Sequence, residues 1–129
     1  MGYYIYTTES TAKIKLSNID KAVETFKEWQ RNNPRLGFTT IDDILSSKNI
    51  KELLNSLRYD CTIDFKYVYI TDFIGEKYGE ELTIHKVLAP FIEDNGYIEY
   101  RGEDGDIWRH IFKNGKASEI HPTMVWEEL

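Results

Sequence analysis

The sequence has few of the residues that cross-link, kink or anchor a chain. Cys61 is the single cysteine, so no disulfide can form within the chain, which is typical of proteins from a reducing compartment. No apolar run approaches the roughly 18 residues that a membrane-spanning helix needs. The first residues also lack the basic and apolar regions of a secretory signal. We therefore expect a cytoplasmic protein without membrane contact.

Motifs for catalysis and cofactor binding are missing as well. The sequence contains no Gly-x-Ser-x-Gly nucleophile motif and no glycine loop with the spacing of a phosphate site. His85, His110 and His121 lack the close spacing of metal ligands on one helix or strand. Cys61 lies among β-prone residues and is expected to be structural. The sequence predicts no metal and no cofactor, and it favours a non-enzymatic protein while leaving an enzyme open.

The composition is that of one globular domain. Hydrophobic residues make up 41% of the 129 residues and aromatic residues 14%, enough to build a packed core without a metal or a disulfide. Charged residues, at 29%, are no more frequent than in ordinary soluble domains. No repeat and no linker divides the chain. We expect a single domain over residues 1–129.

Hydrophobic periodicity predicts an α+β fold. Apolar residues recur at helical spacing in four segments: 19–31, 41–45, a stretch from residue 50 and 80–92. Alternating or β-branched residues mark strands at 3–7, 12–16, 67–71, 97–101, 106–113 and 116–120. We expect a mostly antiparallel sheet of about five or six strands, covered on one face by three or four helices.

Several local signals sharpen this expectation. Asn49 followed by Glu52 predicts a capped helix start, and Asn114-Gly115 predicts a two-residue hairpin turn with positive φ. Gly96 is expected to end the 80–92 helix with positive φ. Beyond Pro122, residues 123–126 are expected to form a last edge strand.

Charge is distributed unevenly along the chain, whose net charge is −6. Residues 1–60 are nearly balanced, whereas residues 61–129 carry fourteen acidic and seven basic side chains. An acidic surface repels a phosphate backbone, which disfavours direct nucleic-acid binding. The excess serves either solubility alone or attraction to a partner with a basic surface.

The densest group of polar side chains lies on two predicted strands and the turn between them. It supplies eight candidate binding residues: Glu99, Arg101, Glu103, Asp104, Asp106, Trp108, Arg109 and His110. Catalysis would need one carboxylate whose pKa is raised by burial or by a like charge. Solvated turn residues and cross-strand ion pairs explain the same pattern more simply. We therefore assign no catalytic residue.

This region also resembles a motif in small uncharacterised proteins of bacteria and their mobile elements. The resemblance rests on Tyr97-Ile98-Glu99, Gly102-Glu103-Asp104-Gly105, Trp108-Arg109, Phe112 and Gly115. Segments 73–79 and 88–90 resemble segments that precede the motif there, so that the likeness covers about residues 66–115. The resemblance favours a bacterial or phage origin. No activity is known for that group, so it carries over no catalytic role.

Three functions remain open. The first, which we expect, is a small acidic binding protein that occupies a basic surface of another protein, as inhibitors or immunity-type proteins of phages and mobile elements do. A homodimer is an added alternative. The second is a small-nucleotide sponge or receptor that uses Arg101, Arg109 and aromatic rings. The third is a hydrolase in which the acids and the histidine of one pocket cooperate; its residues would be Glu99, Glu103, Asp106 and His110.

Overall fold

A computed structural model describes residues 2–34 and 41–128. Within these ranges the chain forms seven strands, four α-helices and two short 3-10 helices. The strands are β1 (Tyr4–Ser10), β2 (Lys13–Lys15), β3 (Tyr59–Ile63), β4 (Tyr67–Glu76), β5 (Tyr97–Gly102), β6 (Ile107–Lys113) and β7 (Lys116–Ile120). The helices are α1 (Ile19–Asn32), α2 (Ile41–Leu45), α3 (Ile50–Ser56), α4 (Glu81–Leu88), η1 (Leu16–Asn18) and η2 (Ala89–Phe91).

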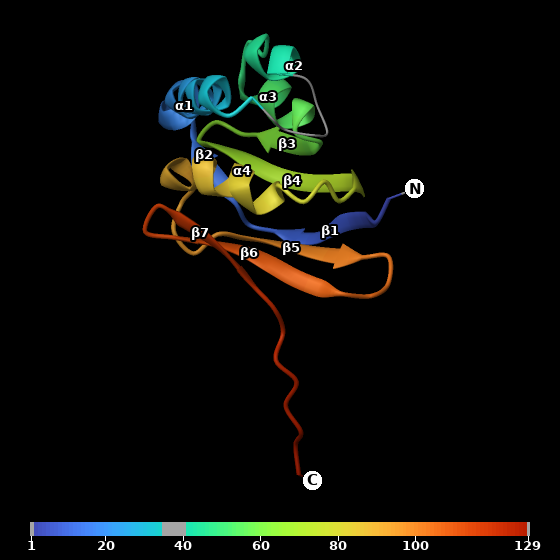
Figure 1. Ribbon diagram of the computed structural model, residues 1–129. Helices are drawn as coiled ribbons and strands as arrows, with labels where there is room; N and C mark the ends of the chain where they lie inside the picture. Colours follow the sequence, from blue (N-terminus) through green and yellow to red (C-terminus); the bar gives the residue numbers. More distant parts are fainter. Residues whose placement is uncertain (1, 35–40, 129) are drawn as a thin grey trace.

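All strand pairings are antiparallel, which confirms the predicted α+β class. The strand order is β2-β4-β1-β5-β6-β7, and β3 also pairs with β4. The long strand β4 therefore belongs to two groups. Its first part pairs with β2 and β3, and its last part pairs with β1. The result is a strongly curled sheet in which β7 is the edge strand at one end (Figure 1).

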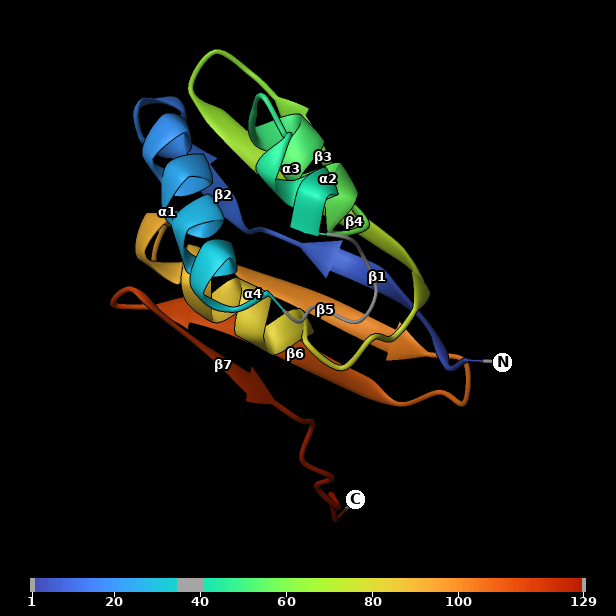
Figure 2. The same ribbon diagram turned by 45° about the horizontal axis from the view of Figure 1, so that its top comes forward.

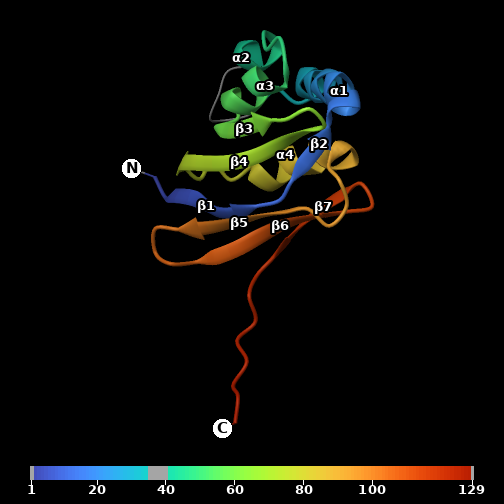
Figure 3. The ribbon, with the colours of Figure 1, turned by 180° about the vertical axis from the view of Figure 1, so that it is seen from behind.

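The helices lie on one side of this sheet. Figure 2 shows α4 over β5, β6 and β7, with α2 and α3 over the β3–β4 pair. Helix α1 contacts α2, α3 and α4. From behind, the opposite side of β5 and β6 has no described helix over it (Figure 3). We call this side of β5–β7 the outer face. Side chains on β5 and β6 alternate strictly between buried positions toward α4 and partly exposed positions on the outer face.

The core forms where the apolar stripes of the helices meet the inner face of the sheet. In α1 the buried apolar residues are Ala22, Val23 and Phe26, at the helical spacing that the sequence shows. In α3 they are Ile50, Leu53 and Leu54. The strands contribute fully buried aromatic rings, namely Tyr59, Phe73, Tyr100 and Phe112. Burial of these large side chains provides most of the driving force for folding.

Two predicted local signals are confirmed. The side chain of Asn49 accepts a hydrogen bond of 2.9 Å from the backbone N–H of Glu52, which caps α3. Asn114 and Gly115 both have positive φ, 54° and 74°, as a tight β6–β7 hairpin requires. The turn residues therefore fix the register in which Lys113 lies opposite Lys116.

Other details differ from the sequence-based expectation. The predicted 80–92 helix ends at Leu88, and Pro90 lies in the 3-10 turn that follows, where its missing donor is tolerated. Asn95, not Gly96, takes positive φ (69°). A Cβ at Gly96 would lie 3.2 Å from the carbonyl oxygen of Glu93 and 3.3 Å from the Cα of Ala12, so backbone atoms would crowd a side chain there.

Two strand assignments also differ. The segment Tyr59–Ile63, which was not predicted as a strand, is β3, so the described sheet exceeds the expected six strands by one. Residues 123–126, predicted as an edge strand, are not part of any sheet. The chain leaves the body after Ile120 and runs outward as an extended segment, residues 121–128 (Figure 1).

Candidate functional site

The eight candidate residues lie at three different places. The outer face holds Glu99, Arg101 and Arg109, and the buried side toward α4 holds Trp108 and His110. The β5–β6 turn holds Glu103, Asp104 and Asp106. The four residues of the hydrolase hypothesis are therefore divided among three environments. Because β5 and β6 alternate sides residue by residue, neighbours in sequence point in opposite directions.

The β5–β6 turn is held by backbone and side-chain hydrogen bonds. Gly105, with φ of +92°, donates to the carbonyl of Gly102 at 3.0 Å, and the N–H of Asp106 donates to Asp104 Oδ1 at 3.1 Å. The N–H of Glu103 donates to the carbonyl of Tyr4 at 3.0 Å, which fastens the turn to β1. The three acidic side chains are exposed. The turn thus presents its carboxylates from a fixed backbone.

Tyr3 packs directly over Gly102 and donates a hydrogen bond to the carboxylate of Asp104. A Cβ at position 102 would lie 1.7 Å from the Tyr3 hydroxyl, so the ring occupies the space that only glycine leaves. The hydrogen bond from Tyr3 lowers the pKa of Asp104, and the same bond raises the pKa of Tyr3 to about 12. Sequence reasoning missed this contact because the two residues lie at opposite ends of the chain.

Exposed tyrosines adjoin this turn. Tyr4, 52% exposed, lies opposite Glu76 of β4, and Tyr6, 43% exposed, lies opposite Arg101 of β5. We call the combined surface the acidic end, formed by Tyr4, Tyr6, Glu76, Glu103, Asp104 and Asp106. Among the described residues, no lysine or arginine forms an ion pair with the three turn carboxylates.

Farther along the outer face, charges neutralise one another. Glu99 accepts hydrogen bonds from Arg109 Nε at 2.9 Å and from Thr8 Oγ1 at 2.7 Å. The Thr8 bond, followed by the Arg109 bond, lowers the pKa of Glu99. The Arg109 guanidinium lies 4.3 Å from the centroid of the Tyr97 ring. Arg109 is therefore already engaged by an acid and an aromatic ring of its own chain. On the buried side of the sheet, the Lys77 Nζ lies 4.7 Å from the centroid of the Trp108 ring.

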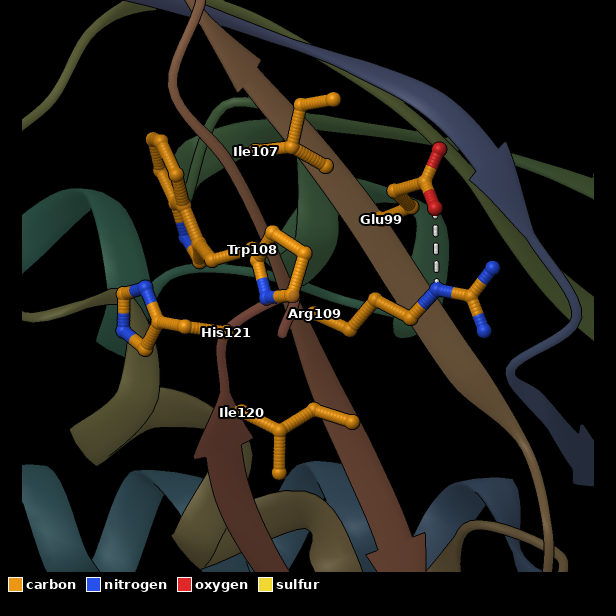
Figure 4. A pocket seen from close by; sticks show the side chains of 7 residues that line it. Glu99, Ile107, Trp108, Arg109, Ile120 and His121 are labelled. Carbon is orange, nitrogen blue, oxygen red and sulfur yellow. Dashed lines mark hydrogen bonds and ion pairs between the residues drawn. The ribbon is translucent and has the colours of Figure 1, made fainter. Parts of the chain in front are cut away.

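A pocket of about 250 Å³ opens beside this row, at the point where the chain leaves β7. Its lining residues are Glu99, Ile107, Trp108, Arg109, Ile120, His121 and Pro122 (Figure 4). In Figure 4 Trp108 and His121 lie on one side of the strands, and the Glu99–Arg109 pair lies on the other. Apolar side chains of Ile107 and Ile120 line much of the space between them. Three of the eight candidate residues contribute to this pocket.

Beneath the sheet, a chain of histidines connects α4 with β7. The Nδ1 atoms of His85 (α4) and His110 (β6) lie 2.7 Å apart, and both side chains are buried. His110 Nε2 lies 3.0 Å from Glu119 Oε1, and His121 Nε2 lies 3.0 Å from Glu119 Oε2. We call these four residues the histidine chain. It runs from the core to the surface through three structural elements.

The contacts determine where the protons lie. Glu119 is an acceptor, so His110 must donate from Nε2 and His121 must donate from Nε2. A neutral His110 protonated at Nε2 then accepts at Nδ1, which makes His85 Nδ1–H the donor of the shared bond. Burial, then the neighbouring His110, lowers the pKa of His85 well below its usual value. Burial also lowers the pKa of His110, against the opposing effect of Glu119.

The role of this chain is structural. Burial alone would raise the pKa of Glu119, but the hydrogen bonds from His110 and His121 outweigh it and lower that pKa. His85 also packs against Tyr59, at 5.3 Å between ring centroids, and the hydroxyls of Tyr59 and Tyr100 lie 2.6 Å apart. A substrate cannot reach the buried imidazoles of His85 and His110, whereas Glu119 and His121 lie at the surface. They satisfy one another and hold β7 and α4 to the sheet.

Sequence reasoning considered His85, His110 and His121 together only for the spacing of metal ligands, and it did not pair His85 with His110. Their contact arises because α4 crosses over β6, which no short-range spacing reveals. In the described part of the chain, no three histidine, cysteine or acidic side chains are arranged to hold a metal ion. The histidine chain is thus an alternating series of hydrogen-bond donors and acceptors, in which the carboxylate of Glu119 lies between the imidazoles of His110 and His121.

Fold and site together define an antiparallel α+β protein with an open sheet face, a fixed acidic turn and a polar chain in its core. Comparisons with protein-family models, with curated protein sequences and with solved structures find no match. The resemblance over residues 66–115 therefore stays a prediction. None of the helices in residues 2–34 and 41–128 has the length and apolar character to span a membrane.

Proposed function

We propose that the protein is a binding protein that occupies a basic surface of another protein with its acidic end. Support comes from the fixed turn, in which three exposed carboxylates project beside two exposed tyrosines. Tyrosine is favoured in interfaces because it buries a large ring while keeping a polar tip. Carboxylates without an internal cation are free to meet one across an interface.

The order of the turn strengthens the proposal. A loop that must become ordered on binding costs conformational entropy, and a loop already fixed by hydrogen bonds avoids that cost. Here the hydrogen bonds from Glu103 to Tyr4 and from Tyr3 to Asp104 fix the loop before a partner arrives. The net charge of −6 further speeds encounter with a positively charged partner. An inhibitor or immunity-type role is the specific form of this function that we expect.

The test compares two variants that lose the same charge. One is Glu103→Gln/Asp104→Asn/Asp106→Asn in the acidic end, and the other is Asp20→Asn/Glu24→Gln/Glu28→Gln on the exposed side of α1. Wild type and both variants, each immobilised, are exposed to lysate of the native host, and the retained proteins are identified by mass spectrometry.

We expect a basic protein that wild type and the α1 variant retain and that the acidic-end variant loses. Its association rate with purified wild type should fall as salt is raised. A photo-crosslinking residue at position 6 should join it covalently, whereas the same residue at Phe65, on the β3–β4 turn, should not. Equal retention by both variants would contradict the proposal.

A further inference from the structure

The extended segment 121–128 carries three neighbouring apolar side chains that contact little of the body. Met124 is 80% exposed, Val125 76% and Trp126 88%. Contiguous exposed apolar side chains of this size are uncommon on a soluble monomer and mark contact sites. Figures 1 and 3 both show the segment running away from the sheet. We therefore expect these apolar side chains to be covered by contact with another surface.

Pro122 explains why this segment does not continue β7. Ile120 lies opposite Arg109, so the same register would place Pro122 opposite Ile107. Proline has no backbone N–H to give to the pairing. β7 thus ends at Ile120. Ile107 and Trp108 of β6, which pair with β5 on one side, have no strand partner among the described residues on the β7 side, beside the pocket. The departure of the chain is what opens that pocket, since Pro122 itself lines it.

The pocket suits one large apolar side chain. Its volume of about 250 Å³ lies below the range typical of drug-sized ligand sites, and Ile107, Ile120 and Pro122 give it apolar walls. Ile120 is 43% exposed, so part of its apolar surface remains uncovered. An indole ring would cover these walls and remain close to the Arg109 guanidinium, which favours aromatic faces.

Charge on the outer face matches the charge of the segment. The outward positions of the β6–β7 hairpin include Arg109, Lys113 and Lys116, and the last two lie opposite each other in register. Directly after Trp126 the segment carries Glu127 and Glu128. An aromatic residue followed by two acids therefore meets, on this face, an apolar pocket beside Arg109, which already pairs with Glu99. The lysine pair Lys113 and Lys116 lies roughly 13 Å farther along the hairpin.

A copy of the chain cannot easily fill its own pocket. Trp126 follows Pro122 by four residues, which span roughly 13 Å when extended. Because Pro122 lines the pocket, the chain would have to reverse within Thr123–Val125 to return, and these residues include no glycine. Two copies related by a two-fold axis face no such constraint, since each can give its segment and receive the other's.

We propose that two copies of this chain associate by exchanging their extended segments, with Trp126 of each copy seated in the pocket at Ile107, Ile120 and Pro122 of the other. Glu127 and Glu128 then lie along the basic hairpin of the recipient copy. The pocket shares no residue with the acidic end, so the exchange does not itself use the turn carboxylates.

Sedimentation analysis from about 5 µM to about 500 µM tests the exchange, a range that reveals micromolar dissociation constants. Wild type should convert from monomer to dimer. Trp126→Ala and Ile120→Glu should each weaken the dimer by at least about tenfold, as loss of a central aromatic anchor or of its pocket does. Phe65→Ala, which removes an aromatic ring that is 93% exposed elsewhere, should leave the dimer unchanged.

A mixture of the two weakened variants distinguishes exchange from a general loss of folding. Trp126→Ala keeps an intact pocket, and Ile120→Glu keeps an intact segment, so one productive contact can form between them. The mixture should therefore contain more dimer than either variant alone at equal total concentration. If mixing has no effect although both variants show the wild-type circular dichroism spectrum, the exchange is wrong.

Fluorine NMR of protein labelled with 5-fluorotryptophan locates Trp126 without further mutation. Its resonance, assigned by its loss in Trp126→Ala, should shift with concentration in step with the sedimentation mass. A shifted, solvent-protected resonance in a protein that is monomeric throughout would show the segment in its own pocket and would overturn the proposal. A solvent-exposed resonance at every concentration would overturn it equally.

Discussion

The buried side chains of α3 are all apolar, whereas those of α4 include polar groups. The buried residues of α3 are Ile50, Leu53 and Leu54. Those of α4 are Glu81, Ile84, His85 and Leu88. Both helices pack on the same curled sheet, and both are equally well covered. The difference is that α4 must find partners for its polar side chains, and α3 needs none.

Those partners come from several elements. Glu81 accepts hydrogen bonds from the N–H groups of Tyr78 and Gly79, at 2.7 and 3.2 Å, and thereby orders the loop before α4. His85 reaches β6 and, through His110 and Glu119, the edge strand β7. Polar contacts are directional, so they fix the position of α4 more narrowly than hydrocarbon packing fixes α3. The same contacts make this region sensitive to protonation.

The largest effect is expected in the hydrocarbon region. Leu53→Ala removes a fully buried side chain and should lower the free energy of unfolding by about 2–5 kcal/mol, because a cavity remains where the side chain was. Urea titration at about pH 7.5 and about pH 5.5 measures it. Since no titratable side chain of residues 2–34 and 41–128 forms a hydrogen bond with Leu53, the loss should be equal at both pH values. If Leu53→Ala lowered the free energy of unfolding twice as much at about pH 5.5 as at about pH 7.5, the packing of α3 would also depend on protonation. That result would contradict the difference drawn between α3 and α4.

The next effect is the response of the histidine chain to acid. His85 and His110 have lowered pKa values in the folded state, so the unfolded chain binds protons more readily. The contribution of the two neutral imidazoles to stability is therefore fully present above the unfolded-state pKa of about 6.5, and it declines as the pH falls below that value. For two such groups the slope reaches at most about 2.7 kcal/mol per pH unit, until the folded pair itself titrates. Urea titrations at closely spaced pH values measure this slope.

A variant without the pair provides the control. His85→Leu/His110→Leu replaces two buried imidazoles by apolar side chains, and its free energy of unfolding should vary much less between about pH 7 and about pH 5. Glu119 acts in the same direction, because a carboxyl group with a lowered pKa also stabilises the folded state less as the pH falls. This contribution is lost only in stronger acid. An unchanged slope in the double variant would assign the acid response to other groups.

A smaller effect is expected at the surface end of the chain. Glu119→Gln replaces a charged acceptor of two hydrogen bonds by a neutral amide, which should cost about 1–2 kcal/mol. The pKa of His110 should fall further, because Glu119 raises it in the wild type. NMR titration of the imidazole protons measures that shift. His121→Ala, which removes an exposed partner of Glu119, should change the stability by less than about 1 kcal/mol.

Much of the fold follows from sequence pattern, because its determinants are local. The stripe Ala22, Val23 and Phe26 and the cap at Asn49 act within one or two turns of helix, and each lies where the pattern predicts it. The Asn114-Gly115 turn likewise needs only two residues that accept positive φ. These elements were predictable because each depends on neighbours within a few positions.

The site was less predictable, because its contacts join distant residues. His85 meets His110 only through the crossing of α4 over β6, and Tyr3 meets Asp104 only through the pairing of β1 with β5. Alternation along β5 and β6 was predictable, and it implies that Glu99 and His110 face opposite sides. The local sequence pattern does not reveal which side of the sheet α4 covers. The covered side decides which residues of β5 and β6 are buried.

Another small effect concerns the acidic end and shows how a polar contact at the surface differs from one in the core. Gly102→Ala places a methyl group where the Tyr3 ring lies, so the ring must move away and its hydrogen bond to Asp104 is lost. Stability should fall by only about 1 kcal/mol, because Tyr3 can turn into solvent. The pKa of Tyr3 should return from about 12 toward its ordinary value near 10. NMR titration of ¹³C-labelled tyrosine follows it directly.

Tyr3→Phe completes this comparison, since it removes the hydroxyl and leaves the glycine. If the contact explains the need for Gly102, then Gly102→Ala should cost markedly less in the Tyr3→Phe background than in wild type, once the hydrogen bond is already gone. An equal cost in both backgrounds would mean that loss of the Tyr3 hydrogen bond is not what makes Gly102→Ala unfavourable, because the Phe ring still occupies the space above Gly102. Binding of the basic partner should weaken in either variant, because the turn that carries the carboxylates loses one of its tethers.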